Sequence, residues 1–257
     1  GVVGDAVLSY NGYYGVSNII QTVDLMNPYE FVKLQTEIDP TRAATTYFKD
    51  GKTLESYRGV EGADFQTKVF EPSPFQNHYV SLTGGNKDTR YSVSGSITDQ
   101  AGIIINSGFT RYQGRATLDQ AVGKKLKIGS NINYAGSRTY GQRPRDQNNN
   151  GTGNNVEFNL MYQIWAYRPI SGATFDLNDI YNDFYDEDAL DPGALTRTLV
   201  NPTTSFSNEY RASFDNTFTG NLYAEYQFTN DLKFRVTGGA NLGSGRNENL
   251  FNSSTRQ

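Results

Sequence analysis

The sequence has no cysteine, one histidine, one tryptophan and two methionines among its 257 residues. The absence of cysteine excludes disulfides and thiolate chemistry. A single histidine cannot supply a cluster of histidine ligands or an H-E-x-x-H metal motif. No G-x-x-x-x-G-K-[ST] or G-x-G-x-x-G pattern follows a strand-like stretch, so the common nucleotide-binding loops are excluded as well. We therefore expect no metal and no other cofactor.

The single histidine, His78, stands beside Tyr79 in a stretch of alternating residues, and no serine or cysteine partner can be assigned to it. A general base or a catalytic triad needs a partner within hydrogen-bond reach. An ordinary strand position is the simpler interpretation of His78. The sequence thus predicts a protein that is not an enzyme.

Long apolar runs are also missing, since no stretch of about 18 such residues occurs, and this excludes a membrane-spanning helix. A mean hydropathy of −0.61 is typical of a soluble protein. A transmembrane β-barrel has the same composition, however, because only alternate residues of its strands meet lipid. The net charge of −4, with both signs interspersed, lacks the basic excess of a nucleic-acid partner.

Tyrosine (18) and phenylalanine (15) are plentiful, which favours β structure. The cleanest alternation of apolar and polar residues runs from Arg90 to Thr98, with Tyr91, Val93 and Ile97 on one face. A period of two residues predicts a strand. Six further stretches show strand character: Ala6–Ser17, Gln76–Thr83, Phe109–Gln120, Leu126–Tyr134, Asn221–Phe228 and Leu232–Asn241. Several of these approach the 9–11 residues that cross a bilayer.

The connections between these strands alternate in length. Gly84–Lys87, Val122–Lys124 and Thr229–Asp231 have the Gly/Asn/Asp chemistry of tight hairpin turns. The intervening connections cover about 18–75, 99–108 and 137–208, and two of them far exceed the usual 4–6 residues. Short turns on one rim and long loops on the other are typical of outer-membrane barrels.

The first long loop contains a helix signal at Asn27–Glu30, with an N-cap residue, a proline at the first helical position and a capping glutamate. Phe31, Leu34 and Ile38 follow at helical spacing. We expect a short amphipathic helix here.

The second long loop has a similar pattern near 156–167, where Pro169 is expected to end the helix. The residues that fit one helical face are Leu160, Met161, Ile164 and Trp165. The preceding stretch, 142–155, is Arg, Asn and Gly with almost no apolar residue, which predicts a mobile, solvated loop.

Five short motifs follow one another between Gln76 and Arg138: Thr83–Asn86, Thr89–Gly95, Asp99–Ile103, Asn106–Tyr112 and Leu126–Asn131. They match, in order, the pattern S-G-G-N, T-R-Y-x-V-S-G, D-Q-x-G-I-x-x-N-S-G-F-x-R-Y and L-K-I-G-x-N. In this the chain resembles the early barrel of SusC/RagA-type TonB-linked outer-membrane proteins. Residues 7–17, 64–70 and 222–239 resemble further family segments, so the likeness covers most of the chain.

The resemblance implies a bacterial outer-membrane nutrient importer with a large plugged barrel, working beneath a SusD/RagB-like surface lipoprotein. It implies contact with the TonB complex through a segment absent here, with the rest of the same barrel and with outer-membrane lipid. The expected fold is therefore all-β, an antiparallel transmembrane β-barrel segment of about seven strands with short helices in long extracellular loops. Plugged transporters close at about 22 strands, so seven cannot enclose a lumen.

Gly1–Asp5 is neither an initiator methionine nor a signal peptide, so we expect a piece of a longer chain. By the resemblance, 1–5 would end the plug or its linker and 6–257 would form the N-terminal part of the barrel. The cargo stays open, because SusC-type members commonly import oligosaccharides and RagA-type members are associated with peptides. The alternative is a soluble or surface β-sandwich that binds carbohydrate through aromatic residues.

Alternation and loop asymmetry together predict which side chains face lipid and which face the lumen or plug. The lipid-facing set is Tyr91, Val93, Ile97, Leu126, Ile128, Ile132, Phe234 and Val236. The opposite set is Arg90, Ser94, Lys127, Asn131 and Arg235. Strand parity further predicts that the long loops lie on the extracellular rim and that the turns at Gly85, Gly123 and Asn230 lie on the periplasmic rim.

The candidate substrate site is the cluster of Trp165, Tyr162, Tyr167 and Arg168 in the longest loop. Aromatic faces stack on sugar rings, and a guanidinium pairs with a peptide carboxylate. The simpler interpretation is that the apolar residues of this helix only pack the loop against its neighbours.

An acidic run in the same loop suggests a cation site: Asp176, Asp179, Asp183, Asp186, Glu187, Asp188 and Asp191. Part of it matches an EF-hand loop, but Ile180 replaces a ligand and Tyr181 replaces the required glycine. A solvated loop is therefore the preferred interpretation, and no metal is expected.

Overall fold

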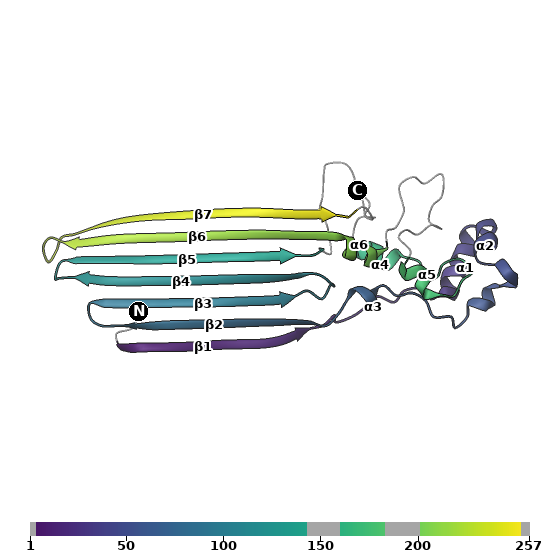
Figure 1. Cartoon of the computed structure of the whole chain (residues 1–257), viewed down its shortest axis with the longest axis horizontal. Helices are drawn as coiled ribbons and strands as arrows, with labels where there is room; N and C mark the ends of the chain where they lie inside the picture. The colour runs from purple at the N-terminus through teal and green to yellow at the C-terminus, as the bar shows by residue number, and fades with distance from the viewer. Residues whose placement is uncertain (1–3, 143–159, 183–200, 253–257) are drawn as a thin grey trace.

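The computed structural model describes residues 4–142, 160–182 and 201–252 (Figure 1). Its main element is one seven-stranded sheet in which every strand pairs antiparallel with the next along the chain. The strands are β1 (Gly4–Ser17), β2 (Ser73–Gly85), β3 (Thr89–Ala101), β4 (Gly108–Val122), β5 (Leu126–Tyr140), β6 (Glu209–Gln227) and β7 (Lys233–Phe251). All seven predicted strands are confirmed.

The predicted strand boundaries are too short, most of all for the last two strands. β6 begins at Glu209 instead of Asn221, and β7 continues to Phe251 instead of ending near Asn241. In the part of β6 before Asn221, Asn216 interrupts the alternation of apolar and polar residues, so alternation alone does not predict a strand there. Backbone pairing with β5 extends the strand regardless of its side chains.

Two of the three short turns adopt the conformations that their residues predict. Gly123, in the turn between β4 and β5, has φ +66°, in the left-handed region that glycine enters without a steric penalty. In the turn between β2 and β3, the side chain of Asn86 accepts hydrogen bonds from the backbone N–H groups of Asp88 and Thr89. These turns all lie at one end of the sheet (Figure 1).

The longer connections are 18–72, 102–107 and 141–208, and the residues of them that the structure describes all lie at the opposite end of the sheet. Their described parts contain α1 (Pro28–Ile38), α2 (Pro40–Thr46), η1 (Lys49–Gly51), η2 (Leu54–Tyr57), α3 (Gln66–Val69), α4 (Leu160–Ala166), α5 (Leu177–Asn182) and α6 (Pro202–Asn208). We call this assembly of loops and helices the cap. None of its described helices is long and apolar enough to cross a membrane.

Helix α1 begins as predicted, because the Asn27 side chain accepts from the N–H of Glu30 and the Glu30 carboxylate accepts from the N–H of Asn27. Its buried side differs from the expected one. Val32 is fully buried and Phe31 only partly, whereas Ile38 is 68% exposed. Ile38 is the last helical residue and extends beyond the packed part of the cap.

The cap has a hydrophobic core of its own, supplied by all three long connections. Its fully or nearly buried members are Val32, Ala43, Tyr47, Tyr57, Ala63, Phe65, Val69, Ile104, Ile164, Tyr167, Ile170, Ile180 and Phe206. The connection between β3 and β4 joins this core through Ile104, and backbone hydrogen bonds from Ile105 to Val69 and from Glu71 to Ile103 hold it there.

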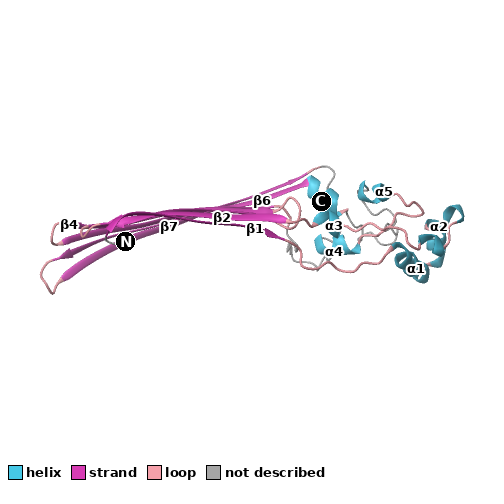
Figure 2. Cartoon of the chain, turned by 90° about the horizontal axis from the view of Figure 1, so that it is seen from below, coloured by secondary structure: helices cyan, strands magenta, loops and turns pink. Residues whose placement is uncertain are grey.

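The sheet, in contrast, is a single layer with the cap beyond its end, as Figure 2 shows. Large apolar side chains on it are exposed, such as Val93 (51%), Val236 (54%) and Leu222 (62%). A β-sandwich would cover them with a second sheet. The described residues form only one sheet, so the structure favours a barrel segment over the sandwich alternative.

Candidate functional site

The strand register assigns every side chain of the sheet to one of two faces. Ile132 pairs with Ala116, which pairs with Val93, and on the other side Ile132 pairs with Gly220. Directly opposite residues share a face, and residues two apart on a strand share it too. All eight residues predicted to meet lipid therefore lie on one face, which we call the apolar face. The five residues of the opposite set lie on the other, the polar face.

On β5 the apolar face runs from Leu126 to Tyr134, a stretch about 27 Å long. Its end nearer the cap is bordered by tyrosines, among them Tyr10, Tyr112 and Tyr134, and its other end by Tyr226 and other aromatics. A band of this height between two aromatic borders is the pattern of the lipid-facing side of membrane barrels.

The polar face carries hydrogen bonds between neighbouring strands. The Asn77 amide donates to Thr98 Oγ1 (2.7 Å), and the Gln113 amide donates to Asn133 Oδ1 (3.2 Å). Such pairs satisfy polar groups across the sheet and leave further donors and acceptors facing outward. This face is suited to contact with water, polar solutes or a polar protein surface.

A larger network lies on the polar face near the short turns. Tyr223 on β6 extends over Gly129 on β5 and donates a 2.7 Å hydrogen bond to Asp119 on β4. The guanidinium of Arg235 on β7 lies 4.0 Å from the centre of the Tyr223 ring and forms an ion pair with Glu225 at 3.8 Å. Side chains of three strands, β4, β6 and β7, are thereby linked across β5.

A hollow of about 400 Å³ lies on the polar face between the cap and this network. Amide, hydroxyl, phenol and guanidinium groups line it, from Asn77, Tyr79, Ser94, Ser96, Gln113 and Arg115. These groups were not among the predicted site residues. The signal was present in the sequence, since they occupy the polar positions of strands that alternation identifies.

The predicted cluster around Trp165 is divided by the structure. Tyr162 and Trp165, one helical turn apart on α4, are both exposed (39% and 43%). Ile164 on the same helix is buried at 1%, and Met161 packs against the cap core. Trp165 is therefore not a core residue of the cap, and the inward face of α4 is formed by its neighbours.

Tyr167 and Arg168, which the sequence placed with Trp165, are buried at 5% and 3% exposure. The ring of Tyr167 packs edge-on against Phe65 with centroids 4.7 Å apart. The N–H of Ala63 donates to the carbonyl oxygen of Pro169 at 2.8 Å. Tyr167 and Pro169 thus join the first and third long connections. Of the four predicted residues, Tyr162 and Trp165 are the two that are exposed to a ligand from outside.

Two tyrosines deeper in the cap have altered acidity. Burial raises the pKa of Tyr57 to about 12, and its hydroxyl donates to the carbonyl oxygen of Tyr47. Burial also raises the pKa of Tyr181, whose hydroxyl accepts from the N–H of Asp64. Both act as neutral hydrogen-bonding groups that fasten the loops.

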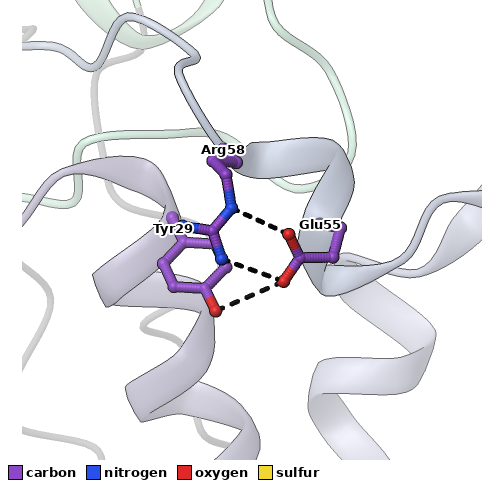
Figure 3. A network of polar contacts seen from close by, with 3 residues as sticks. All are labelled: Tyr29, Glu55 and Arg58. Atoms are coloured by element: carbon purple, nitrogen blue, oxygen red, sulfur yellow. Dashed lines mark hydrogen bonds and ion pairs between the residues drawn. The ribbon is translucent and has the colours of Figure 1, made fainter.

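At the surface of the cap, Tyr29, Glu55 and Arg58 form the contacts in Figure 3. Arg58 donates to both carboxylate oxygens of Glu55 (2.8 and 3.1 Å) and lies 4.2 Å from the centre of the Tyr29 ring. Hydrogen bonding to Arg58 holds the pKa of Glu55 below its ordinary value, and the carboxylate raises the pKa of Arg58. This network ties α1 to η2.

The described part of the acidic run is occupied by local hydrogen bonds. Asp176 Oδ1 accepts from the N–H of Asn178, and Asp179 accepts from the Thr174 hydroxyl. No group of three or more potential metal ligands occurs within residues 4–142, 160–182 and 201–252. Asp183 to Asp191, like the loop predicted at 143–155, lie outside the described residues.

Comparison with known proteins gives a consistent result, although no family model matches. The chain is 23% identical to TonB-dependent receptor P3 of Formosa agariphila over 93% of its length, and 27% identical to TonB-dependent receptor P26 of the same organism over 74%. It is 27% identical to TonB-dependent receptor SusC of Bacteroides thetaiotaomicron over 43%. The chain spans only 21%, 17% and 10% of these relatives.

Solved structures agree on the fold. A chain of the RagAB peptide importer matches 97% of this chain, with TM-scores of 0.66 in the open-open state and 0.65 in the closed-closed state, at 19% identity. The match covers 29% of that chain. The resemblance to SusC/RagA-type TonB-dependent transporters is thus confirmed, and the fold is a barrel segment with short helices in its long loops.

Proposed function

We propose that this chain forms part of the wall of a TonB-dependent importer of the bacterial outer membrane. Its apolar face meets lipid, its polar face lines the lumen and meets the plug, and its cap stands on the extracellular rim. Transport in such a barrel is driven through TonB and needs no chemistry on the substrate. No catalytic role is assigned to any residue.

The observation that carries the proposal is the division of the sheet into two faces. One face is an exposed apolar band with aromatic borders, and the other is a lattice of cross-strand polar contacts. Seven strands of this kind leave unpaired edges at β1 and β7, which hydrocarbon does not tolerate. The remainder of the same barrel is therefore the first partner we propose.

The further partners follow from the relatives. SusC and the RagAB peptide importer support a SusD/RagB-like lipoprotein above the cap. TonB would act through a segment outside this chain, 1–5 would end the plug or its linker, and 6–257 would belong to the barrel. The cargo is an oligosaccharide or a peptide, with Tyr162 and Trp165 as the proposed contacts in the cap.

The test is to follow the full protein in its native cells. We expect it in the outer-membrane fraction, released only by detergent, and we expect disruption of TonB to abolish uptake of the cargo. Recovery of the protein in aqueous buffer without detergent would contradict the proposal and support the carbohydrate-binding sandwich instead.

A further inference from the structure

A second hollow, of about 450 Å³, lies on the apolar face near its border with the cap. Its floor is the pair Gly95 and Gly114, directly opposite each other on β3 and β4. A Cβ atom at Gly114 would meet no atom within 4 Å, and one at Gly95 would meet only the Gln113 carbonyl oxygen at 3.8 Å. The space above both glycines is open. We call this feature the glycine hollow.

The walls of the glycine hollow are aromatic and held in place. On one side Tyr10 stacks on His78 (centroids 6.1 Å apart, planes 18° apart), and its hydroxyl contacts His78 Nδ1 at 2.7 Å. On the other side Tyr134 donates to Asn216 Oδ1 at 2.9 Å. The hydroxyl groups of Tyr10 and Tyr134 are thus hydrogen-bonded to His78 and Asn216, so the two rings present apolar surface to the hollow.

One cation lies just beyond the hollow on the same face. Arg138 is four positions from Tyr134 on β5, about 14 Å toward the cap. Its guanidinium stacks on Tyr140 (4.8 Å) and Phe214 (5.8 Å), and no carboxylate pairs with it among the described residues.

Two described acidic residues of this border, Asp99 and Glu248, have partners other than Arg138. Asp99 accepts from the Thr110 hydroxyl at 3.0 Å, and Glu248 pairs with Arg246 at 2.8 Å. Arg138 is thus a positive charge that no carboxylate of the described residues pairs with, at the level where the apolar face gives way to polar residues.

We propose that the glycine hollow and Arg138 bind one membrane lipid from outside the barrel, with an acyl chain over the glycines and a headgroup phosphate on Arg138. This inference rests on the proposed function, because the apolar face must meet the bilayer. An acyl chain matches an open apolar hollow continuous with the lipid-facing band, and a phosphate matches a guanidinium backed by aromatic rings. The separation of about 14 Å suits one molecule that spans both.

The test fills the hollow and removes the charge in separate variants of the full, assembled protein. Gly114→Leu places a side chain in the hollow, and Gly95→Leu is a second variant with the same purpose. Gly238→Leu is the matched control, since Gly238 lies on the same face of β7 with nothing within 4 Å. Arg138→Gln removes the cation beside the hollow. Arg115→Gln is its control, because it removes a cation from the polar face.

The measurement is native mass spectrometry of lipid retained from micelles that contain either phosphatidylglycerol or phosphatidylcholine. We expect Gly114→Leu and Gly95→Leu to weaken phosphatidylglycerol retention about tenfold relative to Gly238→Leu, as the loss of about two buried methylene groups requires. We expect Arg138→Gln, but not Arg115→Gln, to abolish the preference for phosphatidylglycerol.

Equal retention in the Gly114→Leu and Gly238→Leu variants would overturn the inference, as would equal retention of the two lipids by the unaltered protein. Fractionation separates this failure from that of the proposed function. Variants that all reach the outer membrane yet retain lipid equally would contradict only the lipid site. An unaltered protein that stays outside the membrane fraction would contradict the proposed function itself.

Discussion

The hydroxyl of Tyr223 donates to Asp119 Oδ1 across the intervening strand, and the ring occupies the space over Gly129 that a side chain would need. A Cβ atom at Gly129 would lie 2.2 Å from Tyr223 Cε1 and 2.7 Å from Asp119 Oδ1. The tyrosine and the glycine therefore depend on each other. This contact connects β4 to β6 and, through Arg235, to β7.

The first prediction concerns Gly129. Gly129→Val should destabilise the assembled barrel by about 1–3 kcal/mol, because the new side chain displaces Tyr223 and breaks its bond to Asp119. Gly243→Val, on the same face of β7 with only one backbone atom within 4 Å, is the control. The measurement is the temperature at which the folded barrel loses its heat-modifiable migration. Equal temperatures for the two variants would show that the contact of Tyr223 with Asp119 does not stabilise the barrel measurably.

The second prediction places an arginine on the apolar face. Ile128→Arg should cost about 2–4 kcal/mol if the position lies near the bilayer midplane, and Leu126→Arg, at the border of the band, about 0–1 kcal/mol. Folding titrations into lipid vesicles give both values. Equal and negligible costs would mean that this face does not meet hydrocarbon.

The third prediction concerns the orientation of the two rims. Because these 257 residues contain no cysteine, an introduced thiol is the only one in this part of the protein, and the unaltered protein is the labelling control. A membrane-impermeant thiol reagent on intact cells should label Glu37→Cys, in the cap, and leave Asp231→Cys, in the turn between β6 and β7, unlabelled. The segment 148–155, outside the described residues, is predicted to be accessible on the same side as Glu37. The reverse labelling pattern would overturn the proposed topology.

The fourth prediction concerns pH. Since burial raises the pKa of Tyr57 from 10.0 to about 12, the folded cap holds this proton more tightly than the unfolded chain does. The contribution of protonated Tyr57 to the stability of the cap is therefore complete below pH 10 and is lost as the pH rises toward 12. Resistance of the cap to protease should fall across this window.

Tyr57→Phe tests the assignment. It should lower stability at pH 8 by about 0.5–1.5 kcal/mol through the lost bond to Tyr47 and should weaken the alkaline transition. The alkaline transition should not vanish in this variant, because the pKa of Tyr181 is also raised. Tyr162→Phe, at an exposed position, is the control. An alkaline transition unaltered in the Tyr57→Phe variant would contradict the assignment.

The fifth prediction separates binding from packing on α4. Trp165→Ala should leave the cap folded, because this ring is 43% exposed, and should weaken cargo binding. Ile164→Ala, at a buried neighbour, should instead cost about 2–5 kcal/mol of cap stability. Uptake and equilibrium binding by assembled variants are the readouts. Unchanged affinity in the Trp165→Ala variant would assign the substrate contacts to other parts of the barrel.

Alternation was sufficient to predict the seven strands and their faces, because apolar and polar residues recur with the two-residue period that places them on opposite sides of a sheet. The run around Tyr91 and Val93 predicts a face that the register then extends over all seven strands. The capping box at Asn27 is equally local, so the start of α1 was predicted correctly.

What the sequence did not reveal depends on contacts between distant segments. Tyr167 is buried because Phe65, from the first long connection, packs against it, and no local pattern near Tyr167 indicates this. The early start of β6 depends on pairing with β5 as far as Tyr140. The glycine hollow depends on Gly95 and Gly114 meeting in register, which neither strand shows by itself.

The cap core draws its buried residues from the connections between strands and none from the strands themselves. Substitutions inside the cap therefore leave the strand register and the two faces of the sheet untouched. The consequence is evolutionary: the loops can accept substitutions that suit new molecules in the surroundings without altering the wall that holds them. Exchange of whole caps between homologous barrels should accordingly preserve assembly, and the joints for such a graft are the cap-side ends of β1, β2, β3, β4, β5 and β6.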